Sequence, residues 1–233
     1  MSRIPDTRRT TTDDVIRSLA AQAAPVRPLS SPLLRTLAWL AFAAAVILAV
    51  TLFQGLRVDL LPAITAPWGA IELAASLATG VSAAYAAFQV SVPGRSRRWT
   101  WLPLPFLLLW LGGLGMGCLA DAARLGAAAF DMRAAVGECA RAIALTSLPL
   151  LAGMLLMLRH ASAAGAAPSA WLAMLSAAAL SAVGVTLIHP GETAWMVLVF
   201  HLGAVLVLSL GCLAINRPLF AWIAPARPAV EPR

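Results

Sequence analysis

Long apolar runs separated by short polar segments make up most of the chain after residue 35. Six of these runs approach or exceed the length of about twenty residues that an α-helix needs to cross a bilayer. They cover residues 36–53, 67–90, 101–119, 139–158, 171–188 and 194–215. The runs do not alternate apolar and polar residues as the strands of an outer-membrane barrel do. The pattern therefore predicts an all-α, polytopic membrane bundle of six transmembrane helices.

The first 35 residues are the one sizeable stretch that this pattern places in water. Residues 10–14, Thr-Thr-Thr-Asp-Asp, precede an apolar run. Hydroxyls and acids there satisfy free amides of a helix start and oppose its dipole. The apolar side chains then fall on one helical face, formed by Val15, Ile16, Leu19, Ala20 and Ala23. Because so short a helix is marginal alone in water, we expect this face to bind a partner.

Composition and charge support this interpretation and give the bundle an orientation. With 61% hydrophobic and 12% charged residues, the chain is too apolar for an ordinary soluble domain. The 17 basic residues are all arginine, and 13 of them lie before, between or after the runs on the side of the two termini. The other side has four: Arg57, Arg124, Arg133 and Arg141. The positive-inside rule then predicts both termini in the cytoplasm, and arginines that set topology give no reason to expect direct nucleic-acid binding.

Three segments follow from the pattern. Residues 1–35 form a cytoplasmic head with a short amphipathic helix, residues 36–215 the transmembrane domain, and residues 216–233 a cytoplasmic tail. Within the third run, Gly113 and Gly117 are small residues four apart, which lets helices approach closely. That spacing suits packing inside the bundle, and it also suits a dimer face.

The apolar runs contain one acid and one histidine that are candidates for a functional role. Glu72 stands about one turn into the second run, and His201 stands in the outer third of the sixth. A carboxylate inside a membrane is expensive, so it is a candidate functional group. Glu72 is also close enough to the outer boundary to stay hydrated. The two residues could line a polar pathway in a small transporter or permease subunit, or serve only packing.

Two cysteines fall on the predicted outer side, where disulfides persist. Cys118 ends the third run and Cys139 begins the fourth, while His189 begins the last outer turn. Thiolate and imidazole together suit soft metals, and an accessible thiol is a redox handle. No CxxC or HxxxH spacing marks a preformed site, so the residues alone leave a structural and a sensing role for Cys139 both open.

No enzyme signature is present in the sequence. It has no glycine-rich phosphate loop after a strand, no GxSxG elbow and no HExxH pair. We therefore expect a binding or regulatory protein that is not an enzyme and uses no cofactor.

Several short motifs occur along the chain: Thr-x-x-Val-Ile-x-x-Leu-Ala at residues 12–20, Pro25-Val26, Pro32 and Arg35 before the first run, Cys139, Leu158-Arg159, Pro168 and His189-Pro190. Together they resemble the NrsF-type membrane anti-sigma factors, which regulate extracytoplasmic-function sigma factors negatively. The resemblance spans nearly the whole chain. It implies a bacterial inner-membrane protein whose head holds a sigma factor away from RNA polymerase.

The resemblance also implies how the sigma factor is released. Paired periplasmic cysteines of the family would register metal or redox stress, as a transient metal ion or disulfide. The first family cysteine corresponds to Cys139, but the place of the second is taken by His189. Either Cys118 supplies the partner thiol, or Cys139 and His189 act together as metal ligands, or sensing has drifted.

The leading hypothesis is thus a membrane-bound anti-sigma factor. A small transporter or permease subunit comes second, and a structural membrane partner without a signalling role comes third.

Overall fold

The computed structural model describes residues 11–22, 29–130, 136–159, 166–189, 193–200 and 202–203, and in these it contains helices and no strands. The elements are α1 (Thr12–Ala21), α2 (Pro32–Gln54), α3 (Leu60–Thr65), α4 (Pro67–Val90), η1 (Arg97–Trp101), α5 (Leu104–Leu125), η2 (Gly126–Phe130), α6 (Val136–Leu158) and α7 (Ala166–Ile188). Residues 194–200 and 202–203 are also helical. The chain divides into two units, Met1–Ser30 with α1 and Ser31–Arg233 with the bundle.

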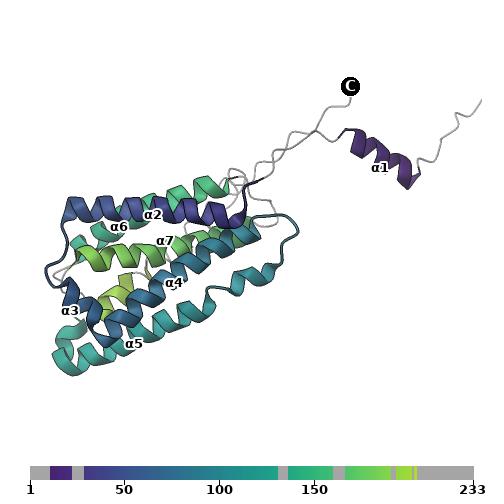
Figure 1. The fold of residues 1–233 in the computed structure, drawn as a ribbon. Coiled ribbons are helices and arrows are strands. Elements are labelled where there is room, and N and C mark those ends of the chain that lie inside the picture. The colour runs from purple at the N-terminus through teal and green to yellow at the C-terminus, as the bar shows by residue number, and fades with distance from the viewer. Residues whose placement is uncertain are drawn as a thin grey trace, which may run out of the picture. The chain divides into compact units, whose positions relative to one another are not determined.

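In the described part of the chain, five helices are long and apolar enough to cross a membrane. They lie side by side in Figure 1 as α2, α4, α5, α6 and α7. The all-helical class predicted from the apolar runs is therefore confirmed. The predicted sixth helix begins as expected at residue 194, but most of it lies outside the described residues. The predicted tail, residues 216–233, lies outside them altogether.

The predicted helix ends agree best with the observed ends where the sequence carries a helix-start signal. α4 has the predicted bounds, because Pro67 favours the first helical position. α2 begins at Pro32, four residues before the predicted start, since the Ser31 hydroxyl accepts a hydrogen bond from the Leu34 amide and caps the helix. Arg35 consequently belongs to the first turn of α2 and not to the head.

Two segments predicted as loops contain helix. The loop at residues 55–65 includes α3, which begins after Asp59. The third apolar run was expected to end at residue 119, but α5 continues to Leu125. Asp121 and Arg124 form an ion pair of 3.3 Å within this extension, and the arginine also suits the negative end of the helix dipole. Gly126, with a φ of 58°, then ends the helix.

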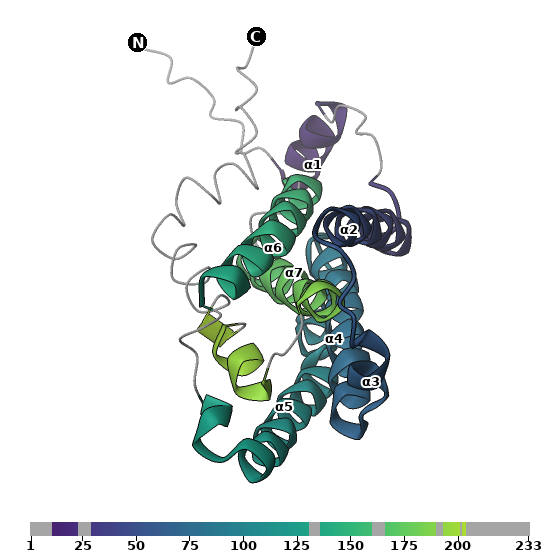
Figure 2. The same cartoon turned by 90° about the vertical axis from the view of Figure 1, so that its left-hand side faces the viewer.

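α7 is the central helix of the bundle. It lies between α4 and α6, with α2 beside it (Figure 2). The closest approach is at Gly80 of α4, where an added Cβ would stand 2.6 Å from the Leu180 side chain. The Ser176 hydroxyl donates a hydrogen bond to the Gly80 carbonyl at this contact. Small residues and buried hydroxyls thus let α4 and α7 pack backbone to backbone, as membrane helices do.

Gly113 and Gly117 take the packing role within the bundle. A Cβ at Gly113 would stand 3.3 Å from Ile71 of α4, and one at Gly117 would stand 2.8 Å from the Ala194 side chain. Both glycines therefore face neighbouring helices of the same chain, which is the first of the two expected roles.

Candidate sensing and partner-binding site

The head helix α1 exposes its apolar face. Its start is a capping box, in which Thr11 Oγ1 accepts from the Asp14 amide and Asp14 Oδ2 accepts from the Thr11 amide, each at 3.3 Å. The side chains of Val15, Ile16 and Leu19 are 45%, 57% and 64% exposed. Ala20 is exposed as well, and no residue of α1 is buried. Ala23, the last predicted member of this face, lies outside the described residues.

Cys139 is buried at one end of the bundle. It lies in the first turns of α6 and is 1% exposed. It belongs to an apolar cluster with Ala142, Ile143, Val185, Ile188 and Met196, so α6, α7 and the helix after residue 193 meet around it. We call this the Cys139 end. A reagent can reach this thiol only when these helices move apart.

His189 lies at the same end. Its amide donates a 2.9 Å hydrogen bond to the carbonyl of Val185, which closes the last turn of α7. Val185 itself packs with Cys139, so the structure brings the two sequence candidates to one end of the α6–α7 pair. Within the described residues, no three His, Cys, Asp or Glu side chains lie close enough to hold a metal ion. A metal shared by Cys139 and His189 would therefore need further ligands from elsewhere.

Cys118 lies on α5 as a half-buried free thiol. The charged groups that act on it are Asp121, one turn further along α5, and Glu72 of α4. It therefore neighbours two acidic side chains, in contrast to the apolar cluster around Cys139. The two thiols have different surroundings, and both are reduced in the structure.

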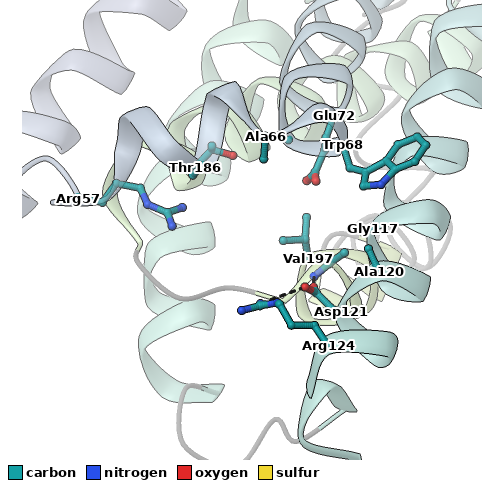
Figure 3. A pocket seen from close by; sticks show the side chains of 13 residues that line it. Arg57, Ala66, Trp68, Glu72, Gly117, Ala120, Asp121, Arg124, Thr186 and Val197 are labelled. Carbon is teal, nitrogen blue, oxygen red and sulfur yellow. Dashed lines mark hydrogen bonds and ion pairs between the residues drawn. The ribbon is translucent and has the colours of Figure 1, made fainter. Parts of the chain in front are cut away.

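A pocket of about 360 Å³ opens beside Cys118 and accounts for the position of Glu72. The Glu72 carboxylate points into it from α4, opposite Asp121 of α5, and Arg57 reaches in from the loop after α2 (Figure 3). Asp121 binds Arg124 and accepts a 2.9 Å hydrogen bond from the Ala194 amide. Glu72 thus faces a polar pocket rather than lipid. His201, its predicted companion, lies outside the described residues.

The charged groups of this pocket hold the ends of the helices. Arg57 makes two 2.8 Å hydrogen bonds to Asp59, and its amide donates to the Leu187 carbonyl at the end of α7. Asp121 places a negative charge at the start of the helix after Thr193, where free amides and the helix dipole favour it. Sequence reasoning missed both roles, although the spacing of Asp121 and Arg124 by three residues was a usable signal.

The opposite end of the bundle is fixed by one buried arginine. Arg35 of α2 is 9% exposed and donates hydrogen bonds to Ser91 Oγ after α4, at 3.2 Å, and to the Met157 carbonyl of α6, at 2.7 Å. Its guanidinium lies 4.5 Å from the centre of the Phe88 ring. We call this the Arg35 end. The sequence identified Arg35 only as a charge that sets topology and as part of a motif.

The bundle and the head helix together indicate a class of protein. A bundle of helices suited to a membrane carries, ahead of it, a short capped helix with an uncovered apolar face. That arrangement is typical of a membrane-bound regulator that holds another protein. A family model described as NrsF, negative regulator of sigma F, matches residues 19–222, and the chain therefore belongs to this family. A sigma factor is the partner that the family implies. No curated protein and no solved structure matches the chain.

Proposed function

We propose that the chain is an inner-membrane anti-sigma factor that binds an extracytoplasmic-function sigma factor through α1 and releases it on a periplasmic metal or redox signal. The observation that carries the first half is the exposed face of Val15, Ile16 and Leu19 on a helix with a complete N-terminal cap. An amphipathic helix of this kind binds by laying its apolar face in a groove of its partner.

The strength of this binding is consistent with a reversible complex. Fully burying a large aliphatic side chain contributes about 1.5–3 kcal/mol, and the three side chains are about half exposed. Burial of their remaining surface therefore contributes roughly 2–5 kcal/mol in total. Part of this is offset by the entropy lost when a ten-residue helix orders on its partner. Binding through the head helix is therefore weak enough for a modest loss of affinity to dissociate the complex.

Release requires the signalled state to bind the sigma factor more weakly. Moving from 99% bound to 99% free takes a difference of about 5.5 kcal/mol between the two states. We place the input at the Cys139 end, because modification of a thiol that is 1% exposed forces its neighbours apart. Metal binding by Cys139 with His189, or a disulfide with Cys118, are the two chemical forms of this input.

Capture of the sigma factor by the full-length protein in nanodiscs tests the first half. The sigma factors to use are the extracytoplasmic-function sigma factors of the same genome, beginning with any that is encoded next to this gene. We expect the wild type to retain one of them and Leu19→Asp to lose it, since a charge would be buried in the groove. Ser18→Asp is the matched control, because it puts the same charge next to Leu19 in the chain but outside the apolar face of α1. Equal loss in both variants, or no capture by the wild type, contradicts the proposal.

A reporter driven by the sigma factor tests the second half in cells. Cys139→Ser should keep repression and lose induction by cadmium, a thiol-reactive metal. Cys118→Ser and His189→Ala then separate the two chemical forms, since a disulfide needs the first residue and a metal pair needs the second. Normal induction of Cys139→Ser removes this residue from the mechanism.

A small transporter or permease subunit is the second candidate function, and the pocket around Glu72 is the observation that favours it. This function predicts that Glu72→Gln abolishes uptake of a solute while the sigma reporter stays repressed. An anti-sigma factor without transport activity predicts no effect of Glu72→Gln on uptake by cells.

A further inference from the structure

α6 connects the two ends of the bundle described above. Cys139 lies near its first residue, Val136, and Met157 lies next to its last residue, Leu158. At a rise of 1.5 Å per residue, the eighteen positions between Cys139 and Met157 correspond to roughly 27 Å. A change around the buried thiol can therefore act on the Arg35 end through this one helix, in which Pro149 removes one backbone hydrogen bond between the two positions.

At the Arg35 end, Arg35 is the side chain that binds the last turn of α6. Met157 carries one of the last four carbonyl groups of α6, which have no partner inside the helix. Arg35 supplies that partner, and its positive charge suits the negative end of the helix dipole. The same guanidinium binds Ser91 and stacks on Phe88 of α4. One side chain thus joins the ends of α4 and α6 to α2.

The position of Arg35 in the first turn of α2 places this link directly after the head segment in the chain. α2 is capped by Ser31, and the unit that carries α1 ends at Ser30, so the head segment leads into the turn that contains Arg35. Further along, a Cβ at Gly153 of α6 would collide with the Phe42 ring of α2, which shows how closely the two helices approach. A shift of the end of α6 must either move the first turn of α2 or break the partly buried, charged hydrogen bond from Arg35 to the Met157 carbonyl. Leaving such a bond unmade is costly.

We propose that Arg35 is the positioning residue that couples the Cys139 end to the sigma-binding head, and this inference rests on the proposed function. In the resting state the link between Arg35 and the Met157 carbonyl fixes the first turn of α2. When α6 is displaced at Cys139, Arg35 carries that turn with it and changes how the head is presented. Arg35 is 9% exposed and lies at the other end of α6 from Cys139, so in this proposal its effect passes through α6 and α2.

The test uses a perturbation that needs no ligand. Cys139→Phe overpacks the buried cluster and displaces the start of α6, and Cys139→Met is a milder version if the first fails to insert. Each is combined with Arg35→Gln, which removes the charge and one of the two donors. Thr36→Val is the matched control, because this neighbour is 3% exposed and its hydroxyl bonds to the Pro32 carbonyl within α2 itself.

Amide hydrogen exchange of the full-length protein in nanodiscs gives a readout independent of the sigma factor. We expect Cys139→Phe to raise exchange in the first turns of both α6 and α2. With Arg35→Gln added, the change in α6 should remain and the change in α2 should disappear. With Thr36→Val added, both changes should remain. Persistence of the α2 change in the Arg35→Gln protein overturns the inference, and so does its loss with Thr36→Val.

The affinity for the sigma factor is measured on the same samples. We expect Cys139→Phe to raise the Kd in the wild-type background and to leave it unchanged, a ratio near one, in the Arg35→Gln background. An unchanged exchange pattern in α2 with normal sigma binding refutes the coupling alone. The expected exchange pattern without any sigma binding supports the coupling and refutes the proposed function, so the two failures are distinguishable.

Discussion

The N-terminal cap of α1 gives the sharpest test of how the head binds. Thr11→Ala removes the hydroxyl that caps this helix. That hydroxyl accepts a hydrogen bond from the Asp14 amide and donates one of 2.7 Å to the Asp14 carboxylate. Loss of such a cap costs about 1 kcal/mol of helix stability. α1 has only ten residues, and helices of this length are marginal in water. The cost therefore appears in the affinity, because the helix must be formed when the partner binds.

A cost of about 1 kcal/mol corresponds to a Kd roughly five times higher. The affinity of the full-length protein in nanodiscs for the sigma factor measures this change, and circular dichroism of a peptide of residues 1–30 measures the loss of helix. Thr12→Ala is the matched control, because Thr12 is the first residue inside the helix, where alanine is favourable. Thr11→Asn should restore both quantities, since asparagine is also a strong cap.

Two results would refute this reasoning. If Thr11→Ala lowers the helix content of the peptide but leaves the Kd within twofold of the wild type, α1 does not bind as a helix. If Thr12→Ala weakens binding as much as Thr11→Ala does, the threonine hydroxyls contact the partner directly and the cap is not the cause.

Three further predictions concern the bundle. Gly80→Ala should destabilise the protein by about 1–3 kcal/mol relative to Gly112→Ala in an SDS unfolding titration, because a Cβ at Gly112 meets nothing within 4 Å. Thr146→Val should cost roughly 0.6 kcal/mol in the same titration, since it removes the buried hydrogen bond between the hydroxyls of Thr146 on α6 and Ser181 on α7. Hydrogen bonds from Arg57 hold the pKa of Asp59 below its usual value. This pair therefore stabilises the protein above the unfolded pKa of about 3.9, and the stabilisation is lost as the pH falls through the lower folded pKa. Asp59→Asn should therefore flatten the decline of stability below about pH 4, and an unchanged decline would show that the pair does not contribute.

The sequence by itself determined where the long helices and the head helix lie. The long apolar runs predicted the five membrane-length helices, and the Thr-Asp start predicted α1, because both signals are local and act within one or two turns. Segments stabilised by polar pairs escaped prediction. The end of α5 lacks an apolar signal, and the pair of Asp121 and Arg124 supports it instead. α3 was missed because it is shorter than a period analysis can detect.

The tertiary structure alone decided what the polar residues do. The sequence left open whether Glu72 is a functional group inside the membrane or a hydrated group near its boundary, and only the packing of α4 against α5 shows that it lines a pocket. It offered Cys139 and His189 as one possible metal pair, and the packing of α6 against α7 shows that both lie at one end of these two helices. In the sequence, Arg35 is one of many arginines that set topology. In the structure it donates hydrogen bonds to Ser91 and Met157, which lie 56 and 122 residues away in the chain. A hydrophobic pattern fixes which residues leave water, but the partner of a buried polar group depends on which helices become neighbours.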